Sequence, residues 1–171
     1  MDPSVDVEEE KVAANFVDYL FRNDETAAVL KCHLQLEMEM DQLLTACLPH
    51  ASEILKRSFL DKAQILYASG LIKEEIFQKI KTFNKVRNKF SHRYGYKLTP
   101  DDIDSLKEIN KGRDVEIPEH FKDVPNIREM LLLAIAVSRL GGTMSVMRDL
   151  AIKNPMLVYQ LSHIMTSGSP K

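Results

Sequence analysis

The chain has 171 residues, of which 44% are hydrophobic and 28% are charged, and its formal net charge is −2. This length predicts a single domain with a substantial core, and the composition excludes a disordered or fibrous protein. The acidic first residues lack the basic region of a secretory leader, and the strongly apolar run 130–138 is too short to cross a bilayer. We therefore expect a cytoplasmic protein that does not use a membrane.

The first part of the chain predicts four helices. The first, over 7–22, lies in an arm with eight acids and two bases before Thr26. The second, over 25–48, is apolar on more than one side and ends at Pro49. Shorter helices follow over 51–57 and 61–69, and Gly70 is expected to end the latter as a left-handed cap.

The stretch 72–96 is the element around which the other helices are expected to pack. Its apolar residues recur at steps of three and four, which predicts a helix with one buried face. The other faces are basic, and no Asp or Glu occurs between Glu75 and Asp101. A basic surface with aromatic residues is suited to nucleic acid or to an acidic protein. The residues expected to bind such a partner are Lys81, Lys85, Lys89, Arg93, Tyr94 and Lys97.

The remainder of the chain predicts more helices and no strand. Gly95 ends the central helix, and Thr99 and Pro100 begin a helix over 101–110. A loop over 115–125 leads to a long helix that begins at Asn126 and contains Gly141 and Gly142, where we expect a kink or a close helix approach. A short helix follows Pro155. The sequence thus predicts an all-α, single-domain bundle of about six to eight helices over 1–166, with a disordered tail over 167–171.

Two sequence features argue against specialised chemistry. Cys32 and Cys47 lie in one predicted helix without other ligands at suitable spacing, so we predict no disulfide, metal or cofactor. The segment 61–81 has the outline of a helix-turn-helix motif. Glu74 and Glu75 would repel phosphates at its reading end, and the second helix is too long, so we do not expect it to read DNA.

Arg87 borders the apolar face of the central helix. A partly buried guanidinium needs an acidic or carbonyl partner, because it cannot lose its charge. Glu37 and Asp41 lie among leucines on the second helix and are the predicted partners. In this interpretation Arg87 is a structural residue that holds two helices together.

A catalytic interpretation stays open beside the structural one. Arg87, Asn88 and His92 match the spacing of HEPN-type ribonucleases, in which Arg is followed by a polar residue and later by His. Histidine can move the ribose hydroxyl proton while arginine stabilises charge on the phosphate, without a metal. Arg87 and His92 do not share a face of an ideal helix, so they would converge only if the helix ended near Ser91.

Several segments share the pattern of one known family: Phe59, Lys62, the run 65–72, the segment 86–92, the helix start 98–103 and the acidic, leucine-rich segment 40–44. Together they resemble the mannitol operon repressor family, over about two-thirds of the chain. The resemblance implies an all-helical bacterial regulator of sugar-alcohol uptake genes without an evident DNA-reading motif, which acts through a protein partner. Other HEPN-like helical proteins share the Arg-x4-His helix. We therefore expect a non-enzymatic transcriptional regulator that forms a homodimer, with a metal-independent ribonuclease as the alternative.

Overall fold

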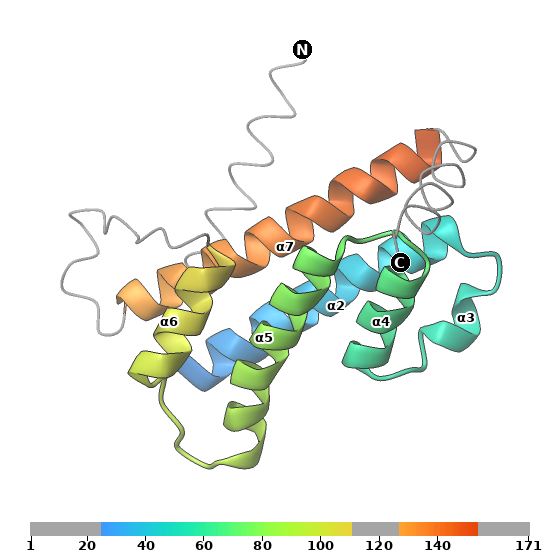
Figure 1. Ribbon diagram of the computed structural model, residues 1–171. Helices are drawn as coiled ribbons and strands as arrows, with labels where there is room; N and C mark the ends of the chain where they lie inside the picture. Colours follow the sequence, from blue (N-terminus) through green and yellow to red (C-terminus); the bar gives the residue numbers. More distant parts are fainter. Residues whose placement is uncertain (1–24, 111–126, 154–171) are drawn as a thin grey trace, which may run out of the picture.

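The computed structural model describes residues 25–110 and 127–153, which contain six helices and no strand (Figure 1). The predicted all-α bundle is confirmed, with the helix count of these residues at the lower end of the expected range. The features predicted at 7–22, at 115–125, at Asn126 and after Pro155 lie outside the described residues. The helices are α2 (Glu25–Cys47), α3 (Ala51–Ile54), α4 (Phe59–Ala68), α5 (Glu74–His92), α6 (Pro100–Ile109) and α7 (Ile127–Lys153).

The two longest helices, α2 and α7, pack along each other, and α4, α5 and α6 cover one side of the pair (Figure 1). Their shared core is aliphatic and includes Leu36 and Met40 of α2 with Leu140 and Met144 of α7, all fully or almost fully buried. α7 continues through both of its glycines, and a Cβ added at Gly141 would lie 3.4 Å from Glu39 Cγ. The close-approach interpretation of this glycine is therefore the one that the structure supports.

By length and composition, Leu131–Lys153 would suffice to cross a membrane, although 44% of the apolar window within it is buried in the protein. The side chains on the buried face of α7 pack against α2 and α6.

The ends of α4 and α5 follow local side-chain chemistry. The Ser58 hydroxyl accepts a hydrogen bond from the Asp61 backbone N–H, so α4 begins two residues earlier than predicted. Gly70, with φ 70°, caps α4 in the left-handed conformation as expected. Leu71 and Ile72 are buried in the connection, and α5 begins only at Glu74.

The connection from α5 to α6 is fixed by a capped helix start. α5 ends at His92, and Gly95 has φ 68°, which is the predicted break. Thr99 and Asp102 form a capping box in which each side chain accepts the other residue's backbone N–H, and Pro100 occupies the first turn of α6. The predicted start of this helix is therefore confirmed.

Candidate functional site

Lys62 of α4 is a buried cation held by two carboxylates of α2. The residue is only 3% exposed, and its Nζ lies 2.8 Å from Glu37 Oε1 and 2.8 Å from Asp41 Oδ1. Burial opposes the charge on Lys62, but hydrogen bonds to Asp41 and Glu37 outweigh it and raise its pKa above the usual value. The ammonium group therefore stays charged and ties α4 to α2.

Lys62 occupies the position that the sequence assigned to Arg87. Both predicted acidic partners, Glu37 and Asp41, bind Lys62, because α4 brings a long basic side chain onto the acidic face of α2. Arg87 Nη1 donates instead to Asn88 Oδ1 over 3.1 Å. Its buried Nε has no hydrogen-bond partner among the described residues. The expected tie between helices is present, but a different residue makes it.

His33 of α2 lies beside this cluster as a buried, neutral imidazole. Its ring packs on Phe59 with centroids 4.3 Å apart, and its Nδ1 lies 3.9 Å from Glu37 Oε2. Burial and then the charge of Arg87 lower the His33 pKa to about 4, and Glu37 opposes this shift only in part. The imidazole is therefore uncharged near neutral pH, and its Nε2 has no partner in the described part of the chain.

Arg87, Asn88 and His92 all lie on α5, but their environments differ. Arg87 and Asn88 are half-buried and bonded to each other, whereas His92 is exposed at the last residue of the helix. Within residues 25–110 and 127–153, no hydrogen bond joins Arg87 to His92. The described contacts therefore do not join the guanidinium and the imidazole into one site.

Asp102 is the centre of a second buried network, at the start of α6. The residue is 1% exposed, and its carboxylate accepts hydrogen bonds from Lys89 Nζ and Tyr96 Oη, each over 2.6 Å. Burial opposes the charge of Asp102, but the bonds from Lys89, Tyr96 and Thr99 prevail and hold its pKa below the usual value. Lys89, a predicted binding residue whose side chain is 38% exposed, is therefore paired with a buried carboxylate.

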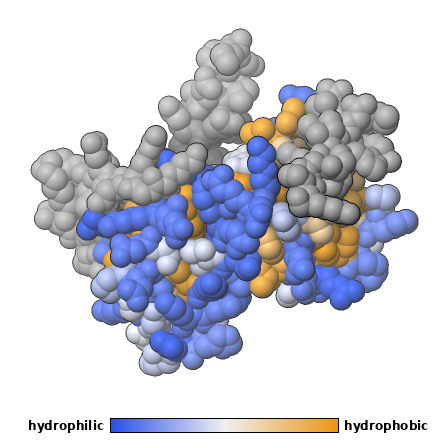
Figure 2. Space-filling model, viewed as in Figure 1, coloured by the Kyte–Doolittle hydropathy of each residue, from blue (hydrophilic) through white to orange (hydrophobic). Residues whose placement is uncertain are grey.

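The other predicted binding residues fall into two groups. Lys81 Nζ lies 5.4 Å from the Phe77 ring centroid and Arg93 Cζ lies 5.7 Å from the Tyr96 ring centroid, so both charged groups contact aromatic faces. Lys85, Tyr94 and Lys97 are exposed. The surface of α5 and α6 seen in Figure 2 is largely hydrophilic, as a charged contact surface requires.

A groove of about 690 Å³ lies along an exposed face of α2 and reaches the end of α7. Leu34, 64% exposed, and Met38, 44% exposed, supply apolar lining from α2, and Ile152 does so from α7. Glu37, Asp41 and Arg148 bring charges of both signs to the same groove. The sequence signalled this face only through the excess of apolar residues around the second helix.

The described residues contain no group of three or more His, Cys, Asp or Glu placed to hold a metal ion. Cys32 and Cys47 are free thiols, and burial raises the pKa of Cys32 to about 12. A thiol with so high a pKa is a poor nucleophile, so Cys32 serves as a core residue.

Comparison with known proteins adds no relative: no protein-family model matches the chain, and no curated protein or solved structure matches it significantly. The site is therefore defined by the chain's own geometry. Its parts are a buried lysine held by two carboxylates, a buried aspartate at a helix start, an apolar groove on α2 and an exposed basic turn between α5 and α6.

Proposed function

We propose that the protein is a non-enzymatic transcriptional regulator of the mannitol operon repressor type, which works in the cytoplasm as a homodimer through protein–protein contacts. This proposal rests on the positions of two groups of polar residues, which include residues that carry the family resemblance. Lys62 holds Glu37 and Asp41, and Asp102 is bound by Lys89, Tyr96 and Thr99. These groups stabilise a bundle and leave the surface to make the functional contacts.

The exposed face of α2 supports self-association. Leu30, Leu34 and Met38 follow each other at steps of four and are all exposed, which is unusual for three large apolar residues in a row on one helix face. A twofold interface pairs one patch with its own copy, so the patch must complement itself. The adjoining groove takes apolar lining from Leu34, Met38 and Ile152, which can supply the centre of such an interface.

The regulatory part is tested by transcript levels of mannitol-uptake genes in a deletion strain, grown with and without mannitol. We expect derepression without mannitol and its reversal by the wild-type gene. Unchanged transcripts in both media would remove the assignment to this type of repressor.

The homodimer is tested separately by light scattering of the purified protein. We expect Leu34→Glu to give monomers, because it places a charge at the centre of an apolar interface. Ser52→Glu on α3, also at an exposed position, is the matched control and should leave the mass unchanged. A wild-type monomer at tens of micromolar concentration would contradict the dimer.

The alternative function is a metal-independent ribonuclease, favoured by one observation on α5. Among the described residues the Arg87 side chain makes one hydrogen bond, to Asn88, so the guanidinium is not committed to an acidic partner and keeps capacity for a phosphate. Purified wild-type protein and an Arg87→Ala, His92→Ala double variant are incubated with single-stranded RNA, with Lys85→Ala as the control. Cleavage that only the double variant loses would favour this alternative, whereas equal cleavage by all proteins, or none, would dispose of it.

A further inference from the structure

Tyr94 and Tyr96, two residues apart in the connection between α5 and α6, have opposite environments. Tyr96 packs edge-on against Phe90, with ring centroids 5.0 Å apart, and donates its hydroxyl to Asp102. Tyr94 is fully exposed. Gly95, in the left-handed conformation, separates them. The connection therefore uses one tyrosine as an anchor and holds the other in solvent.

The turn that carries Tyr94 is fixed on both sides. The Tyr96 N–H donates to the Arg93 carbonyl over 3.2 Å, and the Leu98 N–H donates to Glu25 Oε2 of α2 over 2.9 Å. Beyond it, Thr99 begins α6 with its capping box. A backbone held in this way displays the Tyr94 ring with little further ordering needed on binding.

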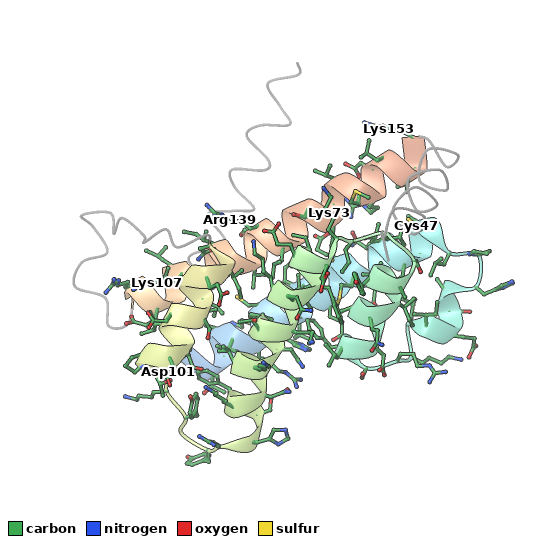
Figure 3. The ribbon with its side chains drawn as sticks, in the orientation of Figure 1. Cys47, Lys73, Asp101, Lys107, Arg139 and Lys153 are labelled. Carbon is green, nitrogen blue, oxygen red and sulfur yellow. The ribbon has the colours of Figure 1, made fainter. Side chains whose placement is uncertain are left out.

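The charged side chains within the turn itself are all basic. Exposed Arg93 and Lys97 flank Tyr94, and no acid occurs from residue 76 to residue 100. The nearest buried acid, Asp102, is matched by Lys89 and cancels none of the exposed charge. Asp101 marks the start of α6 at this end of the molecule in Figure 3. The turn thus joins an open aromatic face to two cations that are free of carboxylate partners in the described residues.

We propose that the turn 92–97 binds single-stranded nucleic acid, with a base stacked on Tyr94 and backbone phosphates contacted by Arg93 and Lys97. An unpaired base offers a π-face to an aromatic ring, whereas bases in a duplex are already stacked on each other. An acidic protein segment would use the same cations but would have no need of the ring. The turn is separate from the α2 groove, so this contact stands or fails independently of the regulator proposed above.

The test is fluorescence anisotropy of a labelled 15-nucleotide oligouridylate with the full-length protein. Tyr94→Ala removes the ring on which one base stacks, so this variant should bind about 5- to 100-fold more weakly. Tyr94→Phe keeps the ring and should bind with nearly wild-type affinity. Arg93→Ala with Lys97→Ala should weaken binding and lower the slope of log K against log salt by about 1.4, since each phosphate contact on a single strand contributes roughly 0.7. Circular dichroism verifies that each variant is folded.

The matched control is the double variant Lys56→Ala, Arg57→Ala, which removes two exposed basic residues just after α3 and should bind like the wild type. Three results would overturn the proposal: no binding at low salt, equal affinity for the duplex of the same length, or full affinity in Tyr94→Ala. The last result, combined with loss in the charge variant, would point to an acidic protein segment as the occupant.

Discussion

Lys62 Nζ on α4 lies 2.8 Å from Glu37 Oε1 on α2, in a position that is almost closed to solvent. The contact joins helices separated by a connection that includes the short α3, so it fixes where α4 lies against the core. Asp102 has a similar role near the C-terminal end of α5, where it joins α5 to α6 through Lys89. Each network fixes the position of one helix beside α5.

Replacing Lys62 by methionine should lower the free energy of unfolding by about 2 to 4 kcal/mol. Methionine fills much of the same space but leaves Glu37 and Asp41 without their cation, and removing one partner of a buried pair is costly. Urea unfolding at neutral pH measures the change. A variant that also carries Glu37→Gln and Asp41→Asn should recover part of the loss, because the stranded charges are gone.

The control for this prediction is Lys56→Met. Lys56 also forms a 2.8 Å ion pair, with Glu53, but both side chains are largely exposed. An exposed pair contributes little, so the expected change is below about 0.5 kcal/mol. Equal losses for the two lysine variants would show that the burial of Lys62 has no energetic effect.

His33 should make the protein less stable as the pH falls from 6.5 towards 4. Its pKa is lowered from 6.5 to about 4 in the folded state, so over this interval the unfolded chain takes up a proton that the folded chain refuses. Stability from this group is complete above pH 6.5 and decreases by about 3 kcal/mol by pH 4, at 1.36 kcal/mol per pH unit. Urea unfolding at several pH values gives the profile.

A His33→Gln variant tests the origin of that profile. Glutamine cannot titrate, so the difference in unfolding free energy between the wild type and the variant should shrink steadily below pH 6.5. His50→Gln, at an exposed position, should keep the wild-type slope. A constant difference across the range would mean that His33 takes up its proton equally in both states.

The helices could be predicted from the sequence because their signals are local. The apolar spacing of α5 and the Thr99, Pro100 and Asp102 signature of α6 depend on residues within one or two turns. The burial of Lys62 could not be predicted in the same way. A lysine beside apolar residues usually extends to solvent, and its burial here depends on carboxylates 21 and 25 residues away.

The different environments of Tyr94 and Tyr96 could not be predicted either, because they also depend on tertiary contacts. Both tyrosines follow a basic helix, and nothing in their immediate sequence distinguishes them. The difference arises when α6 folds back and places Asp102 within 2.6 Å of one hydroxyl. The local sequence pattern thus located the candidate surface. Tertiary contacts decided that Lys89 and Tyr96 bind Asp102, whereas Tyr94 stays exposed and can contact a partner.

Asp102→Asn should destabilise the protein by about 2 to 3 kcal/mol at neutral pH, because the carboxylate accepts a charged hydrogen bond from Lys89 inside the protein. The folded-state pKa lies below 3.8, so this stability is present above that value and is lost as the pH falls through the lowered pKa. The difference in unfolding free energy between the wild type and the variant should therefore decrease below about pH 4. Asp104→Asn, at a carboxylate that is 75% exposed, is the control and should change little at any pH.

Two glycines should respond to alanine with opposite signs. A Cβ at Gly142 on α7 meets nothing within 4 Å, so Gly142→Ala should stabilise the protein by up to about 1 kcal/mol through helix propensity. A Cβ at Gly95 also meets nothing, but φ 68° strains any L side chain, so Gly95→Ala should cost about 1 kcal/mol. Since neither change creates a clash with the described residues, urea midpoints report backbone conformation. A destabilising Gly142→Ala would contradict the open space found beside this face of α7.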